Sequence, residues 1–306
     1  MGYNFSFMSS EMRVRVPASS ANLGPGFDTL GLALEIHLHC RVRRADRLRI
    51  TPQGRDIDRI PADETNLIWR TASKVAAMQG CEMPAVSIEI NNEIPIGKGL
   101  GSSAAALVAG VAIADGILDL DWDDHRILDE AARLEGHPDN VAACVLGSLT
   151  TATIGSDGIT RAVRLDMPPQ FSLAVVCPDF ELSTEKMRAV LPDCYSPKDV
   201  VFNLQRATLF VAALATGNRE AFPAALEDRL HQPYRTAHVP GMAEILKLRA
   251  PGLLGCALSG AGPAMLVFYE KGFEPVVELV REAFRRAGRE SEAWFPKIDS
   301  EGLKIS

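Results

Sequence analysis

The sequence lacks the features that mark several common classes of protein. Its six cysteines are scattered and form no C-x-x-C pair, so we expect a reducing compartment and no structural zinc site. The 39 acidic residues outnumber the 32 basic residues and give a net charge of −7, which argues against nucleic acid as a partner. The apolar stretch after Ser103 is interrupted by Asp115, well short of a membrane span. Residues 1–10 lack the basic start and apolar run of a signal peptide, so we predict a cytoplasmic protein that does not bind membranes.

The rest of the composition is ordinary for a protein with both helices and strands. A chain of 306 residues, 47% of them hydrophobic, suffices for one large or two medium domains with proper cores. Apolar periodicity predicts strands at 12–16 (ended by Pro17), 31–40, 48–51, 86–90, 149–154, 160–165, 171–177, 253–258, 264–269 and 292–295. It predicts helices at 66–78, 107–118, 123–134, 199–216, 221–230 and 276–287. We expect strands 31–40 and 48–51 to pair in antiparallel fashion, and the mixture of elements predicts an α+β fold.

A glycine-rich segment, Pro95-Ile-Gly-Lys-Gly-Leu-Gly-Ser-Ser-Ala-Ala-Ala106, connects a predicted strand to a predicted helix. Glycines without a Cβ let backbone N–H groups approach an anion, and the start of a helix favours negative charge. Lys98 adds a mobile positive charge, and the hydroxyls of Ser102 and Ser103 can cap the helix, contact a phosphate or ligate Mg²⁺. The spacing fits neither a Walker A loop nor a Rossmann loop. The segment therefore predicts phosphate binding of another type, with a serine-capped connector as the alternative.

The densest polar cluster of the chain is Glu135-Gly-His-Pro-Asp-Asn140. Glu135 is a candidate oxygen ligand for Mg²⁺. His137 could act as a general base or a hydrogen-bond donor, although a lone histidine is more often structural. Asp139 and Asn140 could cap the next helix, which would account for one of the two but not for both. We therefore favour a functional site here.

Two other kinds of polar residue are candidates for binding a small ligand. Asn22 and Asp28 lie in a segment rich in Ser, Asn, Gly and Pro, where they could face a ligand or hydrogen-bond their own backbone. Arg188 and Arg235 are candidates for carboxylate binding because a guanidinium matches a carboxylate with two hydrogen bonds. The alternative for either arginine is a surface salt bridge.

Three segments together resemble the GHMP small-molecule kinases. They are Asn22-Leu-Gly-Pro-Gly-Phe-Asp28, Pro95-Ile-Gly-Lys-Gly-Leu-Gly-Ser-Ser103 and Ser259-Gly-Ala-Gly-Pro263, whose order and spacing match over nearly the whole chain. Within that superfamily, Pro17-Ala-Ser-Ser-Ala-Asn-Leu-Gly-Pro-Gly-Phe-Asp28 and Gly136-His-Pro-Asp-Asn-Val-Ala142 are most similar to the homoserine kinases. Mevalonate and galactose kinases share the glycine-serine loop but not these two segments as a set.

The resemblance implies a two-domain GHMP kinase architecture. The first domain would be similar to domain 2 of ribosomal protein S5 and the second would be ferredoxin-like, with the site between them. We assign residues 1–11 to a flexible extension, 12–165 to the nucleotide-binding domain and 166–306 to the ferredoxin-like domain. A homodimer is an expectation at the level of the family.

The resemblance also implies an activity, namely transfer of phosphate from ATP to L-homoserine with Mg²⁺ present. Residues 95–105 would hold the phosphates, which places Pro95, Ile96, Gly97, Lys98, Gly99, Leu100, Gly101, Ser102, Ser103, Ala104 and Ala105 in the nucleotide site, and Asn66 would reach the adenine. Ser103 and Glu135 would hold Mg²⁺. Homoserine would be surrounded by Asn22, Asp28, His137, Asn140, Thr184, Arg188 and Arg235, and the catalytic residues would be Lys98, Asn140 and Arg188.

The chemistry of the substrates agrees with these assignments. The homoserine carboxylate needs cations such as Arg188 and Arg235, and its ammonium needs an anion such as Asp28. Phosphoryl transfer asks mainly for alignment and charge neutralisation, so we expect direct in-line transfer without a committed base, with Asp139 or His137 as the reserve. The alternatives are another GHMP kinase, of the mevalonate or sugar type, and a non-catalytic nucleotide or amino-acid sensor.

Overall fold

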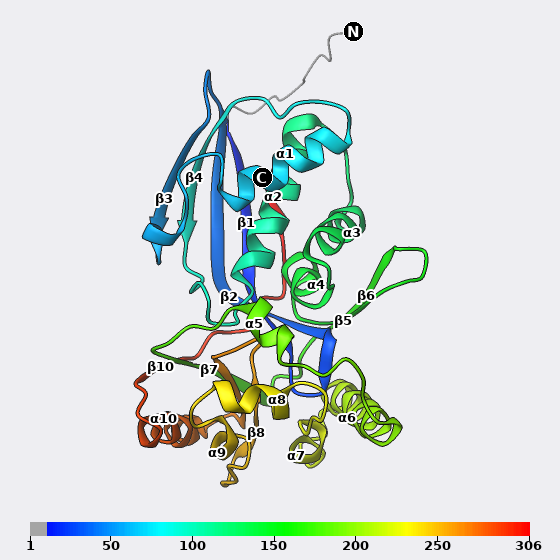
Figure 1. Cartoon of the computed structure of the whole chain (residues 1–306), viewed down its shortest axis with the longest axis vertical. Helices are drawn as coiled ribbons and strands as arrows, with labels where there is room; N and C mark the ends of the chain where they lie inside the picture. Colours follow the sequence, from blue (N-terminus) through cyan, green and yellow to red (C-terminus); the bar gives the residue numbers. More distant parts are fainter. Residues whose placement is uncertain (1–10) are drawn as a thin grey trace.

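Two β-sheets, one above the other in Figure 1, organise the protein, whose computed structural model describes residues 11–306. The seven strands of the first sheet are β1 (Met12–Asn22), β2 (Gly26–Arg44), β3 (Arg49–Gly54), β4 (Val86–Asn92), β5 (Leu149–Ile154), β6 (Thr160–Leu165) and β11 (Lys304–Ile305). They follow the order β11-β1-β2-β4-β3, and the hairpin β5–β6 joins through β2. The helices beside this sheet are α1 (Leu67–Met78), α2 (Ser102–Leu118), α3 (Asp124–Glu135) and α4 (Asp139–Leu146), and the short helix η1 (Ile57–Arg59) follows β3.

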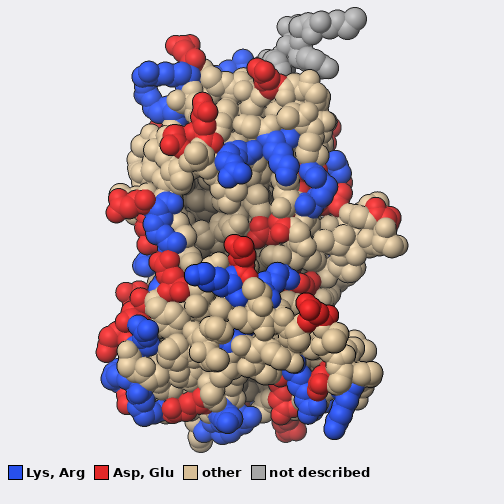
Figure 2. Space-filling view, in the orientation of Figure 1, with Lys and Arg blue, Asp and Glu red and all other residues tan. Residues whose placement is uncertain are grey.

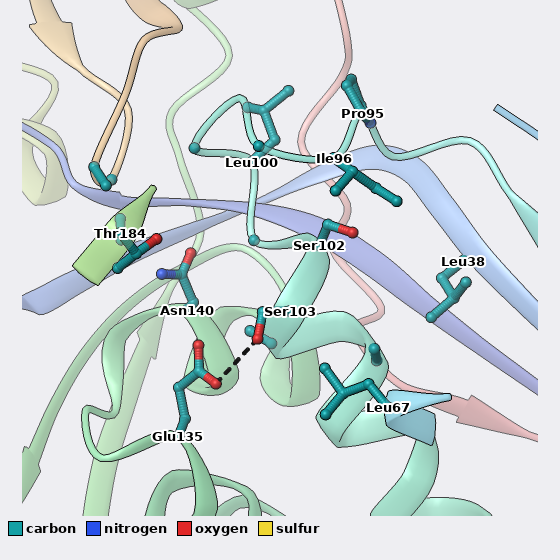
Figure 3. A pocket seen from close by; sticks show the side chains of 18 of the residues that line it. Leu38, Leu67, Pro95, Ile96, Leu100, Ser102, Ser103, Glu135, Asn140 and Thr184 are labelled. Atoms are coloured by element: carbon teal, nitrogen blue, oxygen red, sulfur yellow. Dashed lines mark hydrogen bonds between the residues drawn. The ribbon is translucent and has the colours of Figure 1, made fainter. Parts of the chain in front are cut away.

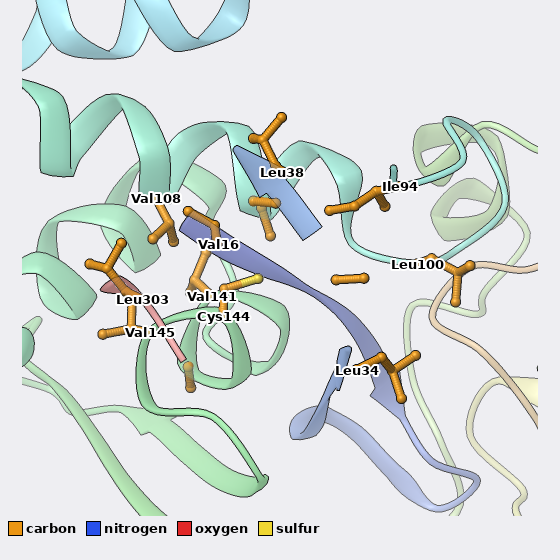
Figure 4. Close-up of a cluster of buried hydrophobic side chains, with 14 of the residues drawn as sticks. Val16, Leu34, Leu38, Ile94, Leu100, Val108, Val141, Cys144, Val145 and Leu303 are labelled. Atoms are coloured by element: carbon orange, nitrogen blue, oxygen red, sulfur yellow. The ribbon is translucent and has the colours of Figure 1, made fainter. Parts of the chain in front are cut away.

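Helix α2 is apolar on all sides because it lies in the middle of the first domain. Its core positions from Ala104 to Ile117 are buried, and it packs against α1, α3, α4 and β1. A Cβ on Gly110 would lie 2.5 Å from the Cβ of Thr71 on α1, so only glycine allows the two helices this close approach. Figure 4 shows Val108 of α2 near Val16 of β1 and Val141 of α4 in the same core.

The second sheet has four antiparallel strands in the order β10-β7-β9-β8, namely β7 (Phe171–Pro178), β8 (Leu253–Leu258), β9 (Met265–Glu270) and β10 (Ser291–Trp294). Its helices are α5 (Thr184–Ala189), α6 (Pro197–Thr216), α7 (Phe222–Ala225), α8 (Gln232–Arg235), α9 (Met242–Ile245) and α10 (Val277–Arg286), with the short helices η2 (Thr236–His238) and η3 (Glu274–Val276). One face of the sheet packs on α9 and α10. The other face shares a single hydrophobic core with the first domain, so the two domains are in contact through buried apolar surface.

The α+β class and the two-domain architecture are confirmed, but three details of the predicted fold are wrong. Strand β1 does not end at Pro17, because a register shift between Pro17 and Ala18 accommodates the proline and pairing with β2 continues to Asn22. Strand β3 pairs in parallel with β4, which lies between it and β2. The predicted helix at 221–230 is the short helix α7.

The end of the chain also departs from the prediction. Residues 304–305 pair with β1 in the first sheet, and Leu34 forms a bridge with Ile298. The last segment therefore belongs with the first domain and not with the second. Of the predicted extension, residues 1–10 lie outside the described residues, whereas Glu11 forms ion pairs with Arg13 and Arg43.

Two sequence-based exclusions can be compared with the structure. All six cysteines, which fall within the described part, are free thiols, and Cys40, Cys144, Cys177 and Cys256 are buried. Among residues 11–306, no helix combines the length and apolarity needed to cross a membrane.

Candidate active site

The glycine-rich segment forms the loop between β4 and α2, and its backbone explains its composition. Gly97, Gly99 and Gly101 all have positive φ angles, of 75°, 79° and 68°, which residues with a Cβ rarely adopt. A Cβ on Gly99 would also lie 2.2 Å from the carbonyl oxygen of Ser259. The loop ends at Ser102, where α2 begins with its free N–H groups and its positive dipole end. This geometry suits an anion.

The late glycine loop, Ser259–Pro263, holds the first one in place. The Ser259 hydroxyl donates to the Gly99 carbonyl over 2.7 Å, and the Ala264 N–H donates to the Lys98 carbonyl over 3.1 Å. The two glycine loops are therefore in direct contact through their backbones.

Lys98 is a correction to the sequence prediction. Its ammonium donates to the carbonyl oxygens of Pro178 and Phe180, at 2.9 and 2.8 Å, where β7 ends. It does not line the cavity, because these two acceptors hold it on the opposite side of the loop. Lys98 therefore connects the phosphate-type loop of the first domain to the second domain.

A cavity of about 330 Å³ lies beside this loop, between the two domains. Figure 2 shows a hollow on this face with acidic and basic side chains at its rim. The predicted residues that line it are Asn22, Asp28, Asn66, Pro95, Ile96, Gly97, Gly99, Leu100, Gly101, Ser102, Ser103, Ala104, Glu135, His137, Asn140, Thr184, Arg188 and Arg235. Ala105 does not line the cavity, because it lies on the side of α2 that is buried in the core.

Ser103 and Glu135 face each other at the side of the cavity next to α2. Figure 3 shows the two side chains pointing toward one another, with 3.4 Å between Ser103 Oγ and Glu135 Oε2. Burial raises the pKa of the Glu135 carboxyl above its ordinary value, and the charge of nearby Asp139 adds to the effect. His137 Nε2 lies 4.0 Å from Glu135 Oε1 and is the basic neighbour of this carboxylate. A hydroxyl beside a carboxylate is an oxygen donor set of the kind that Mg²⁺ prefers. The residues present therefore fit a magnesium ion.

His137, Asp139 and Asn140 form a connected group at the start of α4. His137 Nδ1 lies 2.9 Å from Asp139 Oδ1, and the same carboxylate accepts the N–H of Asn140 over 2.7 Å. Burial alone would lower the pKa of His137, but the hydrogen bond to Asp139 and its charge raise it above the ordinary value. Asp139 therefore stabilises the protonated form of the imidazole, and its own carboxylate already accepts from two donors. Neither is well placed to act as a base.

Ser19 orients Asn140, and sequence reasoning did not single it out. The Ser19 hydroxyl donates to Asn140 Oδ1 over 2.9 Å, which leaves the NH₂ group of Asn140 for the cavity. A Cβ on Gly101 would lie 2.1 Å from Ser19 Oγ, so the loop, the serine and the asparagine are tightly packed. The only signal for Ser19 in the sequence was the pair of serines near the start of the segment Pro17–Asp28.

Asp28 and Arg188 form a bidentate ion pair across the two domains. The guanidinium of Arg188 donates to the two carboxylate oxygens of Asp28 over 2.8 and 2.9 Å. The Arg188 side chain is 42% exposed and the Asp28 side chain is 32% exposed, so the pair sits at the open side of the cavity. The hydrogen bond to Asp28 raises the pKa of Arg188.

Arg235 differs from Arg188 in both burial and partners. It is only 2% exposed, and its guanidinium donates to the carbonyl oxygens of Met187 and Gly260 over 3.1 and 3.0 Å and contacts His231 Nδ1 at 3.2 Å. Within residues 11–306, no carboxylate oxygen lies within 4.0 Å of it. Burial lowers its pKa to about 10, and repulsion from Arg188 adds to this effect. Arg235 is therefore a buried cation on the cavity wall without an acidic partner.

The two predicted asparagines, Asn22 and Asn66, support the wall of the cavity more than they offer free groups to it. Asn22, with φ 69°, accepts the Asp28 N–H over 3.0 Å and donates to the Gly260 carbonyl over 3.0 Å. Asn66 caps α1 by accepting the Ile68 N–H over 2.9 Å and donates to the Pro61 carbonyl over 2.7 Å. Adenine contact by the Asn66 side chain is therefore not what this arrangement favours.

The part of the cavity beside Asn66 is apolar, apart from one arginine that the sequence gave no reason to select. Leu67, Ile68, Ile60 and Pro61 line it, as suits a flat aromatic ring system. Arg59 donates to the Ile96 carbonyl over 2.9 Å and to Glu181 over 2.7 Å. It thus connects the glycine loop with the second domain at the rim.

Comparison with known proteins agrees with this geometry. A family model described as the GHMP kinases N terminal domain matches residues 66–148, and the GHMP kinases C terminal model matches residues 210–289. A homoserine kinase of Solibacter usitatus is 61% identical over 301 residues, 98% of this chain and 99% of that protein. A homoserine kinase of Deinococcus radiodurans is 47% identical over 268 residues, 86% of this chain and 87% of that protein. The crystal structure of a homoserine kinase from Cytophaga hutchinsonii is 26% identical, covers 100% of both chains and superimposes with a TM-score of 0.83.

The chain therefore belongs to the GHMP kinases, as its three glycine-rich segments indicated. GHMP kinases transfer phosphate from ATP, and the fold and the loop are those of this class. Within the class the chain belongs to the homoserine kinases, which confirms the closer resemblance of the segments Pro17–Asp28 and Gly136–Ala142.

Proposed function

We propose that the protein phosphorylates the side-chain hydroxyl of L-homoserine, with ATP as donor, and releases O-phospho-L-homoserine and ADP on the route to threonine. The observation that carries the proposal is a buried guanidinium without an acidic partner, Arg235, in the same cavity as the carboxylate of Asp28 and beside a phosphate-type loop. A zwitterion with a hydroxyl group complements these charges. Identity of 61% to a homoserine kinase over nearly the whole chain supports it.

The nucleotide binds along the loop from Pro95 to Ala104. Its phosphates accept hydrogen bonds from the N–H groups of the loop and of the first turn of α2. Its adenine occupies the apolar part of the cavity near Leu67 and Ile60. Lys98 does not contact the phosphates in this account, because its ammonium is bonded to Pro178 and Phe180. It acts as a positioning residue that fixes the loop.

Ser103 and Glu135 hold the magnesium ion. When bound there, Mg²⁺ neutralises charge on the phosphate oxygens and helps to align them. Glu135 contributes most when its carboxyl is ionised. Burial raises the pKa of that carboxyl, whereas a nearby cation favours its ionised form.

Homoserine binds across the other half of the cavity. Its carboxylate pairs with Arg235, and Thr184 at the start of α5 lies on the same wall. Its ammonium binds Asp28, whose oxygens are occupied by Arg188 in the free protein. The ammonium must share or replace that contact, and a released Arg188 is then available to the reacting phosphoryl group.

The transfer is a direct in-line displacement. The hydroxyl oxygen of homoserine forms a bond to the γ-phosphorus while the bond from that phosphorus to the β,γ-bridging oxygen breaks, and ADP leaves. The NH₂ group of Asn140 orients the hydroxyl oxygen, because Ser19 occupies the amide oxygen. The hydroxyl proton passes late to an oxygen of the transferred group, since Asp139 stabilises the protonated form of His137 and already accepts from two donors.

A substrate panel tests the proposal. Purified full-length protein with ATP and Mg²⁺ is assayed for ADP release with L-homoserine, L-serine, L-threonine, mevalonate and galactose. We expect fastest turnover with L-homoserine and a phosphomonoester product by phosphorus NMR. Faster turnover of mevalonate or galactose would identify another kinase of the superfamily, and no ADP release with any alcohol would identify a sensor.

Three further points stay predictions. A cytoplasmic location rests on sequence composition, and so does the absence of a nucleic-acid partner. A homodimer rests on resemblance alone.

A further inference from the structure

We propose that His37, His39 and Glu93 form a second metal site that binds a zinc-class transition-metal ion on the face of the first sheet opposite to the one from which Leu38 lines the kinase cavity. The chain has no cysteine pair of the kind that holds structural zinc. The site is built instead from two imidazoles and one carboxylate, and it does not depend on the proposed function.

The three ligands converge because of strand geometry. His37 and His39 are two residues apart on β2 and therefore project from the same face of the sheet. Glu93 directly follows β4, which pairs with this part of β2. The Glu93 N–H donates to the His37 carbonyl over 3.0 Å, and the His37 N–H donates to Glu93 Oε2 over 2.9 Å. The backbone thus fixes the carboxylate beside the two rings.

The distances suit an ion better than direct contact among the side chains. Glu93 lies 3.9 Å from His37 Nδ1 and 3.9 Å from His39 Nε2, and the three ligand atoms all lie within 4.8 Å of one another. These separations are too long for hydrogen bonds. Ligand atoms at about 2.0–2.1 Å from a tetrahedral zinc ion lie roughly 3.3 Å apart. Small side-chain movements therefore close the site, and water completes the coordination.

His37 also has the second partner that metal-binding histidines usually have. Its Nε2 lies 2.7 Å from Asp299 Oδ2, and Asp299 is 3% exposed. Asp299 Oδ1 also accepts the N–H groups of Gly302 and Glu301, over 2.7 and 2.8 Å, as an ionised carboxylate does. The ionised carboxylate can only accept, so Nε2 donates and the lone pair of Nδ1 is left for the metal.

The surrounding charges permit a cation. Arg15 is the cross-strand partner of His39, and its guanidinium lies 2.6 Å from Glu301 and 3.7 Å from Asp299, so carboxylates offset its charge. A neutral imidazole is the form that binds metals. Nitrogen-rich ligands select zinc, cobalt or nickel over Mg²⁺, which distinguishes this site from Ser103 and Glu135.

Metal binding here should stabilise the fold. The ion would join β2 to the end of β4, and Asp299 would couple it to the last segment of the chain, which returns to β1. A ligand that binds only the folded state raises the melting temperature.

The test measures zinc and cobalt binding directly. Full-length protein with Cys81→Ser and Cys194→Ser, which removes the two exposed thiols, is titrated with Zn²⁺ by calorimetry in the presence of excess Mg²⁺. We expect one ion per chain, a higher melting temperature and, with Co²⁺, visible absorption typical of nitrogen and oxygen ligands. His39→Ala should abolish these signals, and Asp299→Asn should weaken binding about 10- to 100-fold.

The matched control is His125→Ala, because His125 is an exposed histidine on α3 far along the chain from the site. It should bind as the parent does. Unchanged Zn²⁺ binding by His39→Ala, or no binding by the parent, would overturn the inference. Magnesium-dependent ADP release by His39→Ala shows that the variant is folded. If the parent itself shows no kinase activity, the proposed function fails, but the zinc titrations still decide whether the metal site exists.

Discussion

The two halves of the cavity are built in different ways. The nucleotide half is made of backbone, with three glycines at positive φ and the first turn of α2. The amino-acid half is made of charged side chains that come from distant parts of the chain, among them Asp28, Arg188 and Arg235. Backbone recognition depends on the shape of one loop, whereas side-chain recognition depends on pairs of charges. The two halves should therefore fail separately when they are mutated.

The largest expected effect belongs to Asp28. In Asp28→Asn the ammonium of homoserine loses its partner and Arg188 is left unpaired. Once bound homoserine covers the cavity, loss of the partner of its ammonium costs about 2–5 kcal/mol, or roughly 30- to 4,000-fold in affinity. Steady-state kinetics should show kcat/KM for homoserine falling within that range, while the affinity for an ATP analogue stays as in the parent. Asp124→Asn, at an exposed position on α3, is the control. An equal loss of affinity for the ATP analogue in Asp28→Asn would show that the two halves are coupled.

Gly99→Ala should damage the nucleotide half. An added Cβ would meet the Ser259 carbonyl oxygen at 2.2 Å, at a backbone φ of 79°. The loop must shift, and a displacement of about 1 Å in a catalytic site can cost roughly 100-fold in rate. Homoserine binding by calorimetry should survive. Gly80→Ala has a similar φ, of 74°, but nothing within 4 Å of the added Cβ, so its activity should stay near that of the parent.

Glu135→Gln should change the pH and magnesium dependence. The carboxyl of Glu135 has a raised pKa because it is buried. Its ionised form is lost as the pH falls through a value above the ordinary 4.5, so kcat/KM should fall on that side and higher Mg²⁺ should shift the fall to lower pH. The variant should lose this dependence and need about 10- to 100-fold more Mg²⁺. An identical pH profile in parent and variant would remove Glu135 from the metal site.

Glu135 also gives a stability prediction with a definite sign. A carboxyl whose pKa is raised by folding stabilises the folded state below its unfolded pKa, and that contribution disappears as the pH rises through the folded value. Without metal, the neutral glutamine should therefore raise the melting temperature near neutral pH, by about 2 °C for each 1 kcal/mol gained. Differential scanning calorimetry with and without Mg²⁺ measures it.

Lys98→Met should have the smallest effect on catalysis. Its loss leaves the carbonyls of Pro178 and Phe180 without a donor, which costs about 1–3 kcal/mol of stability. Because Lys98 does not reach the cavity, kcat/KM should fall less than about tenfold, whereas a lost transition-state donor costs about 100- to 1,000-fold. Urea unfolding measures the loss of stability and steady-state kinetics measure the loss of activity. Lys74→Met, at an exposed position on α1, is the control. A loss of the larger size would restore Lys98 as a phosphate contact.

The contrast between the halves also explains what could be predicted from sequence. A backbone site is encoded in consecutive residues, so the glycine loop was visible in Pro95–Ser103. The fold class followed from periodicity. The pairing of β3 with β4 did not, because register and neighbours depend on crossovers that periodicity does not contain. The return of residues 304–305 to β1 is a long-range contact of the same kind.

Side chains in the other half were identified but their partners were not. Asp28 and Arg188 are 160 residues apart, and nothing in either segment indicates that they pair. Lys98 was assigned to phosphate binding by its place in the loop. The direction in which its side chain points, however, depends on a carbonyl acceptor at the end of β7. Ser19 was missed because its role exists only once α4 lies beside β1.

The central claim is that Arg235 recognises the carboxylate of homoserine, and a comparison of two ligands tests it most directly. Calorimetry measures the affinity of parent and Arg235→Met for L-homoserine and for 3-aminopropan-1-ol, which lacks only the carboxylate. The parent should prefer homoserine by roughly 30- to 4,000-fold, and Arg235→Met should lose that preference while binding an ATP analogue as the parent does. An undiminished preference in the variant would contradict the account.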